Sequence, residues 1–353
     1  MKELEYPFDA AYIIKKRKSL KKALLADGTS RIRKKIAVFG GSTTSDIVKT
    51  LELFLLDAGI EPEFYESEYA QYFQDAMFPD ETLLSFKPDI VFIHTTNRNV
   101  TDWPEMTDTT EQIDEKLHTE INRFTAMWKS IAEKFHCPII QNNFEMPLYR
   151  LLGSRDAWDI HGRTNFLTRL NEAFYAYARE NESFYIHDLN FVSADYGLKE
   201  WSNPLFWNMY KYAMCFEAIP SFAFSVSHII KSIFGKNKKA LALDLDNTLW
   251  GGVVGDDGVD GIEIGQETGV SQSYYEFQTY VKQLKSLGIV LTVCSKNDHE
   301  NAIAGLNHPE GALRPDDFVI IKANWENKDR NIAETAAEPV SYTHLTLPTN
   351  SLV

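Results

Sequence analysis

Short apolar runs alternate with amphipathic stretches along the first two thirds of the chain. The runs have the length and the β-branched content of buried strands, and we predict strands at 35–40, 62–67, 88–95, 137–143 and 183–189. Apolar positions at helical spacing predict helices at 44–59, 110–135, 164–181, 204–216 and 221–234. This alternation predicts a mostly parallel sheet with helices on both faces.

The same alternation restarts at Ala240. Strands are expected at 240–246, 289–295 and 317–321, and helices at 271–287, at 298–305 and from 331 onward. A glycine-rich stretch, 251–265, is expected to form a turn and a flap. We therefore predict the α/β class, with two doubly wound parallel-sheet domains.

Composition divides the chain into four parts. We expect a basic N-terminal arm at 1–35, a first domain at 36–235, a linker "GKNKK", and a second domain at 239–338. Residues 339–353 contain no Asp, Glu, Lys or Arg, and we interpret them as a non-native tail of cloning or adaptor origin on a truncated second domain. A genuine flexible tail is the alternative.

The net charge of −14 argues against non-specific nucleic-acid binding. Residues 1–35 are the exception, with eleven Lys or Arg against four Asp or Glu. This arm could meet an acidic partner, or it could be a solvated surface helix that packs through Ile13, Ile14, Leu24 and Leu25.

Location is indicated by what the sequence lacks. There is no run of 18 apolar residues and no signal-peptide pattern, so we expect no membrane association. Three widely spaced cysteines, Cys137, Cys215 and Cys294, suit a reducing cytoplasm better than a disulfide framework or a zinc cluster.

The strand "ALALDLD" ends in two aspartates, Asp244 and Asp246. Carboxylates at the carboxyl end of a strand lie where doubly wound sheets bind ligands. They suit Mg²⁺, which prefers oxygen ligands and a substrate phosphate. One aspartate could attack phosphorus, and the other could serve as general acid and base.

Three segments carry a family resemblance. "DLDNTLWGGVVGDDG" (244–258) resembles motif one, DxDxT, of the haloacid dehalogenase (HAD) superfamily, and its longer form resembles the FkbH-like subfamily, also called HAD subfamily IIIC. "VCSKND" (293–298) resembles motif two and "NWENKDRNI" (324–332) resembles motif three. The three motifs occur in the family's order.

The resemblance implies roles for five residues. Asp244 would be the nucleophile and a Mg²⁺ ligand, and Asp246 the acid and base, giving its main-chain carbonyl to the metal. The phosphate-binding residues would be Thr248, Ser295 and Lys328. The implied activity is a Mg²⁺-dependent phosphatase acting through an aspartyl-phosphate on a phosphorylated small molecule, and the FkbH-like subfamily implies transfer of a glyceryl group to an acyl carrier protein.

Two features of this region affect the expected activity. Only 51 positions separate Asp244 from Ser295, so no large cap domain fits between them. The family's fourth motif supplies a further acidic pair, but only ten positions separate Lys328 from Glu338, where the native-looking sequence stops. We therefore expect an incomplete Mg²⁺ site and weak or absent activity.

The first domain has a candidate site of its own. In "VFGGSTTSD" (38–46), Ser42 resembles the nucleophile of SGNH (GDSL-type) hydrolases, and in "HTTNRN" (94–99), Asn97 resembles their oxyanion-hole asparagine. FkbH-like proteins commonly carry such an SGNH-like domain.

A serine nucleophile needs a base, and no histidine occurs between His187 and His228, where that family has one. An esterase therefore stays an alternative. The other readings are serine and threonine caps on a helix, a pocket for an acyl or phosphate group, and a non-catalytic module that docks a carrier protein.

Cys294 adjoins Ser295. It could carry an acyl group beside the phosphate site, but strand alternation predicts that it points away from Ser295 and serves packing.

Overall fold

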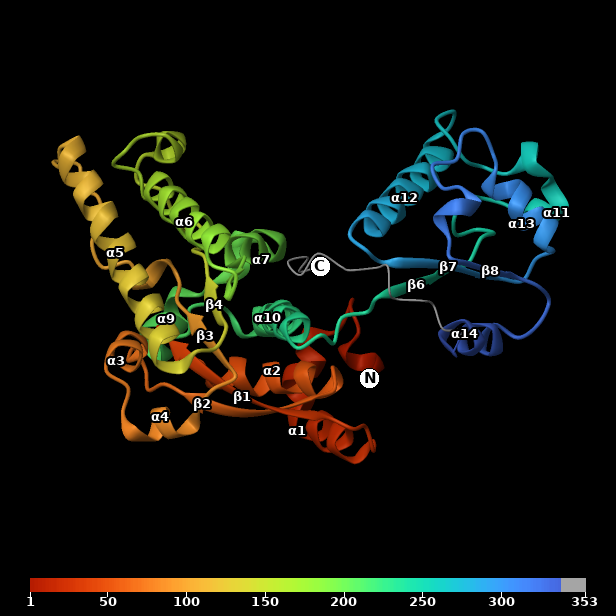
Figure 1. The fold of residues 1–353 in the computed structure, drawn as a ribbon. Helices are drawn as coiled ribbons and strands as arrows, with labels where there is room; N and C mark the ends of the chain where they lie inside the picture. The colour runs from red at the N-terminus through yellow and green to blue at the C-terminus, as the bar shows by residue number, and fades with distance from the viewer. Residues whose placement is uncertain (338–353) are drawn as a thin grey trace. The chain divides into compact units, whose positions relative to one another are not determined.

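The computed structural model describes residues 1–337, so the tail predicted at 339–353 lies outside the described residues (Figure 1). The chain divides into two compact units, residues 1–236 and the part from 237 onward. Each unit is built on its own parallel sheet.

The first unit contains five strands in the order β2-β1-β3-β4-β5, all parallel. The strands are β1 (Ile32–Gly40), β2 (Ile60–Glu66), β3 (Ile90–His94), β4 (Ile139–Asn142) and β5 (Phe184–His187). This is the flavodoxin-like strand order. The chain adds β2 on one side of β1 and then adds β3, β4 and β5 on the other side, so the direction in which strands are added changes between β1 and β3. The predicted α/β class with parallel sheets is confirmed.

Helices cover both faces of this sheet (Figure 1). One face packs against α1 (Ala10–Ala26), α2 (Ser45–Asp57) and α10 (Ile219–Ile233), and the other against α3 (Tyr72–Met77), α5 (Thr110–Phe135) and α6 (Arg163–Glu180). Alternation along β1 separates the two cores, because Ile36 and Val38 belong to the first and Ala37 and Phe39 to the second.

Shorter elements complete the first unit. They are η1 (Lys2–Leu4), α4 (Glu81–Phe86), η2 (Asn97–Asn99), η3 (Gly153–Ala157), α7 (Leu189–Tyr196), α8 (Leu198–Trp201), α9 (Pro204–Tyr210) and η4 (Phe216–Ala218). The helix predicted at 204–216 is too long. It ends at Tyr210 because Lys211 adopts a left-handed conformation with φ of 59°.

The basic N-terminal segment forms α1. Asp9 caps the helix by accepting a hydrogen bond from the Tyr12 amide at 3.0 Å. Ile13 and Leu24 are buried as predicted, whereas Leu25 is 52% exposed, so that expectation is wrong. Arg17 forms an ion pair with Asp46 of α2, so part of the basic charge is neutralised within the unit.

The second unit has three parallel strands in the order β6-β7-β8: β6 (Ala240–Leu243), β7 (Val290–Ser295) and β8 (Ile320–Ala323). Its other elements are α11 (Val254–Asp257), η5 (Val259–Gly261), α12 (Gly269–Ser286), α13 (His299–Leu306), η6 (Pro315–Asp317) and α14 (Lys328–Ala337). Figure 1 shows α14 on the opposite side of this sheet from α12 and α13. Only α11, η5 and α12 lie between β6 and β7.

In the second unit, two strands differ from the prediction by three residues at one end. The strand expected at 317–321 begins at Ile320, because residues 315–317 form the 3-10 helix η6. The strand expected at 240–246 ends at Leu243, so both aspartates lie beyond it. Among the described strands β6 is at an edge, and Ala240 and Ala242 are exposed.

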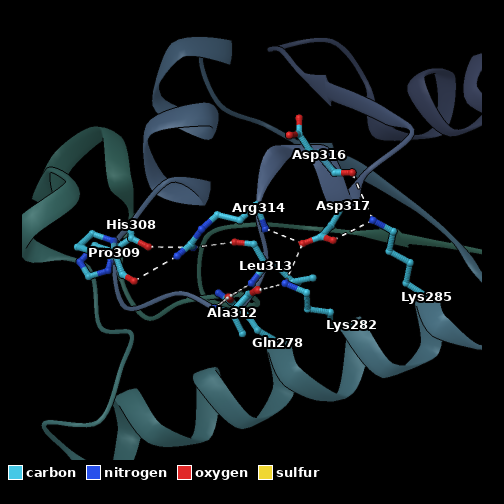
Figure 2. Close-up of polar contacts among 10 residues, drawn as sticks. All are labelled: Gln278, Lys282, Lys285, His308, Pro309, Ala312, Leu313, Arg314, Asp316 and Asp317. Carbon is cyan, nitrogen blue, oxygen red and sulfur yellow. Dashed lines mark hydrogen bonds and ion pairs between the residues drawn. The ribbon is translucent and has the colours of Figure 1, made fainter.

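A buried glutamine connects three parts of the second unit. Gln278 of α12 is 3% exposed and donates from Nε2 to the Leu249 carbonyl at 2.8 Å. Its Oε1 accepts from the amides of Ala312 and Leu313 at 2.9 and 3.0 Å (Figure 2). Leu249 follows the two aspartates and Leu313 precedes β8, so Gln278 connects the loop after β6 with the segment that leads into β8.

The same connection extends along α12 through charged groups. Asp317 accepts from Lys285 at 2.8 Å and from the Arg314 amide at 2.9 Å, and Arg314 donates to the carbonyls of His308 and Pro309 (Figure 2). Burial raises the pKa of Asp317. The hydrogen bonds from Lys285 and from the Arg314 amide lower it by more than burial raises it, so the pKa lies below its ordinary value.

We predict that Gln278→Leu destabilises the second unit by roughly 2–4 kcal/mol, because two buried amides and one carbonyl lose their partner. Urea unfolding, followed by a probe in this unit, measures the change. Gln283→Leu, an exposed glutamine on the same helix, is the matched control. Equal stability of the two variants would contradict this role for Gln278.

Candidate functional site

The carboxyl edge of the β6-β7-β8 sheet brings three of the predicted residues together. Asp244 follows β6 directly, Ser295 is the last residue of β7, and Lys328 is the first residue of α14, which follows β8. The parallel register pairs Leu243 with Val293, so β7 ends at Ser295, only two residues beyond the level at which β6 ends. This explains why residues 84 positions apart in the sequence come into contact.

Asp244 has the closest contacts of the group. Its Oδ2 accepts a hydrogen bond from Lys328 Nζ in an ion pair, its Oδ1 accepts from the Leu245 amide at 3.0 Å, and Ser295 donates a further hydrogen bond. Burial raises the pKa of Asp244, but the hydrogen bonds from Lys328, Ser295 and the Leu245 amide outweigh it, so the pKa lies below its ordinary value. The carboxylate is therefore ionised at neutral pH, as a nucleophile must be.

Asp246 is held separately. Its Oδ1 accepts from Trp250 Nε1 at 3.0 Å and from the Val254 amide at 3.1 Å, and its Oδ2 accepts from Asn297 Nδ2 at 2.9 Å. The turn that follows is a tight one, in which Asn247 has φ of 55° and its Oδ1 accepts from the Gly252 amide. Both carboxylate oxygens are thus oriented by neighbouring groups.

Thr248 and Asn297 also belong to the motifs at this edge. Thr248 donates its amide to the Leu245 carbonyl at 3.1 Å, and its hydroxyl forms no hydrogen bond within residues 1–337. Asn297, 3% exposed, was missed as a functional candidate although it lies two residues after Ser295 in the second motif. Its contact with Asp246 shows that the two motifs are connected through side chains.

The donor set at this edge is compatible with part of a Mg²⁺ site. Mg²⁺ is commonly held by one or two carboxylates, with waters and substrate phosphate completing the shell. Asp244 is placed to give a carboxylate oxygen, whereas both carboxylate oxygens of Asp246 already accept hydrogen bonds, which favours its main-chain carbonyl as the ligand. Within the described residues no group of three or more His, Cys, Asp or Glu side chains could hold a metal ion.

Cys294 is 6% exposed, and its Sγ contacts the Lys328 carbonyl at 3.6 Å. Val293 on the same strand belongs to the core on the α12 and α13 side, so Cys294 faces α14 instead. Burial raises the pKa of the Cys294 thiol. These observations fit packing rather than a reactive thiol.

The Ser42 loop of the first unit is closed by its neighbours. Ser42 is 2% exposed and its Oγ has no hydrogen-bond partner among the described residues. Thr43 bonds to the main chain of Tyr210 and Lys211 at the end of α9. Thr44 is the N-cap residue of α2 but makes no capping hydrogen bond, because its hydroxyl donates to Glu66 at 2.6 Å. The predicted serine and threonine caps are therefore wrong.

Asn97 does not contact Ser42. Its Nδ2 donates to the carbonyls of Glu145 and Met146 at 3.3 and 3.5 Å, in the loop after β4. Asn99 is the asparagine that reaches the Ser42 loop, with Nδ2 donating to the Gly41 carbonyl at 2.9 Å. A Cβ at Gly41 would lie 2.5 Å from the Asn99 amide group, so this approach requires glycine.

A buried polar row at the ends of β3, β4 and β5 was not predicted. Asn142 donates from Nδ2 to His94 Nδ1 at 2.9 Å and accepts at Oδ1 from His187 Nδ1 at 2.8 Å, and Ser225 of α10 reaches His187 Nε2 at 3.0 Å. Burial lowers the pKa of both histidines to about 3, so both rings are neutral. Neither histidine is hydrogen-bonded to Ser42, and the base that an esterase needs is not supplied by this row.

The sequence and the structure both match known proteins. The family profile described as "FkbH, N-terminal domain" matches residues 35–231, and the chain belongs to this family. A crystal structure of the N-terminal part of the protein BF1531 from Bacteroides fragilis, described as containing a phosphatase domain complexed with Mg, is 29% identical to this chain, with a TM-score of 0.80 over 91% of this chain and 84% of that one. This chain is thus an FkbH-like protein.

Two other solved structures are less similar. They are a putative acylhydrolase from Bacteroides fragilis, 17% identical with a TM-score of 0.34, and a GDSL-like lipase from Bacteroides thetaiotaomicron, 14% identical with a TM-score of 0.32. Each match covers 62% of this chain, with 96% of the first and 99% of the second. No curated protein matches the chain. None of the helices in residues 1–337 is both long enough and apolar enough to span a membrane.

We predict that Lys328→Met raises the pKa of Asp244, because burial continues to raise it while the hydrogen bond and the charge of Lys328, which lower it, are lost. Carbon-detected NMR titration of the aspartate carboxyl groups measures this, with Asp244→Asn to assign the signal. Lys296→Met, an exposed lysine on the next loop, is the control and leaves the titration unchanged. An Asp244 pKa that is insensitive to Lys328→Met would contradict the ion pair.

Proposed function

We propose that the Asp244 site catalyses Mg²⁺-dependent phosphoryl chemistry of the HAD type. The observation that carries the proposal is the convergence of an ionised carboxylate, a lysine ammonium and a serine hydroxyl at the carboxyl edge of one parallel sheet. The described similarity to a protein with a Mg-complexed phosphatase domain supports it.

In the proposed reaction the Asp244 carboxylate attacks phosphorus. A bond forms between its oxygen and phosphorus while the bond to the leaving oxygen breaks, and Asp246 gives a proton to that oxygen. Lys328 and Ser295 then interact with the phosphoryl oxygens, so the ammonium that now pairs with Asp244 would be shared with the substrate. Asp246 afterwards removes a proton from the water that hydrolyses the aspartyl-phosphate.

The hydrogen bonds to Asp246 are part of this proposal. Trp250 and Asn297 orient the carboxylate, and Oδ2, which within the described chain accepts only the hydrogen bond from Asn297, has a lone pair left to carry the transferred proton. Bound Mg²⁺, held through Asp244 and the Asp246 main chain, would neutralise charge on the phosphate and the attacking carboxylate. Thr248, whose hydroxyl has no partner within the described chain, is proposed to contact the phosphoryl group.

Family membership supports a finer proposal for the activity. We propose that the phosphorylated donor carries a three-carbon glyceryl group and that an acyl carrier protein receives it, with loss of phosphate. A cytoplasmic location fits the three cysteines, which are all free thiols in the described chain.

We predict that purified protein hydrolyses p-nitrophenyl phosphate weakly and only with Mg²⁺, because the described residues supply few acids at this edge. Asp244→Asn lowers the rate at least about 100-fold, since the nucleophile is lost. Initial rates with Mg²⁺ and with EDTA provide the measurement.

Asp256→Asn, an exposed acid in α11, is the matched control and retains the wild-type rate. Two results would refute the assignment: turnover that persists in EDTA, or an Asp244→Asn variant as active as the wild type.

A further inference from the structure

A pocket of about 260 Å³ lies in the first unit, at the carboxyl ends of β3 and β4. Its walls come from the loop after β3, the loop after β4, the start of α6, and α8 and α9. Ligands of open α/β sheets bind at this edge. Neither Ser42 nor any residue of the Asp244 site lines it.

Two arginines line the pocket without an acidic partner. Arg98 lies 4.4 Å from the centroid of the Trp207 ring, and Arg163 lies 4.9 Å from that of Trp103. Within residues 1–337 neither guanidinium forms an ion pair or a hydrogen bond, although the chain has a net charge of −14. A guanidinium that stacks on an indole keeps its in-plane donors available for an oxyanion.

The one carboxyl group in the wall does not cancel these charges. Glu145 is 3% exposed, and its Oε2 accepts from the Asn97 amide at 3.1 Å. Burial raises the pKa of Glu145 to about 8, and hydrogen bonds with the main chain and the charge of Arg98 only partly oppose this. At pH 7 the group is mostly neutral, so the pocket is positive.

The remaining wall is apolar and aromatic. Trp103, Trp207, Met146 and Leu148 provide surfaces against which a ring or a short chain can pack. The volume lies just below the usual range for small-molecule pockets, about 300–1,000 Å³, and this favours a ligand with a single ring or a short acyl chain.

We propose that this pocket binds a small organic oxyanion, a carboxylate or a phosphate ester with an apolar body, held by Arg98 and Arg163 and packed against Trp103 and Trp207. The site is independent of the proposed phosphatase chemistry, because it lies in the other unit and shares no residue with it.

The test is isothermal titration calorimetry of the full chain with phenylacetate and, in a second arm, phenyl phosphate, both without Mg²⁺. Phenol, which lacks the charge, and inorganic phosphate, which lacks the apolar body, are the ligand controls. We expect both probes to bind more tightly than either control. The probe that binds more tightly shows whether the pocket prefers a carboxylate or a phosphate ester.

Arg98→Gln and Arg163→Gln each weaken binding of the tighter probe by about tenfold or more. Arg155→Gln is the matched control, since Arg155 also lies over a tryptophan, Trp158, but pairs with Asp159 and does not line the pocket. Arg163 is exposed, so its variant is expected to fold normally even if Arg98→Gln does not.

A pH series adds a second readout. Ionisation of Glu145 places a negative charge in the pocket, and the other charged or titratable groups in the wall are Arg98, Arg163 and Tyr149. Phenylacetate binding therefore weakens between pH 7 and pH 9, and Glu145→Gln removes this decline.

The proposal is overturned if neither probe binds more tightly than phenol, or if both arginine variants bind like the wild type. Binding that responds to Lys328→Met but to neither arginine variant would place the probe at the Asp244 site and would likewise overturn it.

Discussion

The ion pair between Asp244 and Lys328 is the interaction on which the candidate site depends. It joins the end of β6 to the start of α14, and Ser295 at the end of β7 completes the contact. Without the lysine, the pKa of Asp244 would rise, because burial would be opposed in the described chain only by the hydrogen bonds from Ser295 and the Leu245 amide. The fold serves this pair in two ways: the parallel strands end at one edge, and Gln278 connects the loop after β6 with the segment that leads into β8.

Both units place polar groups at the carboxyl edge of a parallel sheet, but they do so with different chemistry. The second unit gathers charged side chains that are partly exposed, as a reaction with a phosphorylated substrate requires. The first unit buries a neutral row of His94, Asn142 and His187, which connects three strand ends. Two arginines of the same unit, Arg98 and Arg163, line a pocket that also contains Trp103 and Trp207. A single architectural rule thus places charged side chains at this edge in one unit and a neutral buried row at it in the other.

Much of this arrangement could be predicted from periodicity and motif order. The helix at 110–135 has the predicted bounds because its capping box and amphipathic pattern are local signals. The proximity of Asp244, Ser295 and Lys328 could also be predicted, because their motifs lie at or after the ends of neighbouring strands. The pairing of Asn97 with the Glu145 loop, and of Asn99 with Gly41, could not be predicted, because neighbouring loop residues compete for the same contact and only tertiary packing decides between them. Arg98 and Arg163 gave no local signal, since the absence of an acidic partner is a property of the folded chain.

The most direct test of the account is to locate the phosphoryl group on the protein. Asp246→Asn is expected to slow hydrolysis of the intermediate, so this variant is incubated with Mg²⁺ and p-nitrophenyl phosphate, quenched in acid and reduced with borohydride, which converts an aspartyl-phosphate to homoserine. Peptide mass spectrometry then identifies the modified residue. The account predicts homoserine at position 244 and no modification when Asp244→Asn is added. Modification at another residue, or an unmodified Asp244 in a variant that still releases p-nitrophenol, would contradict it.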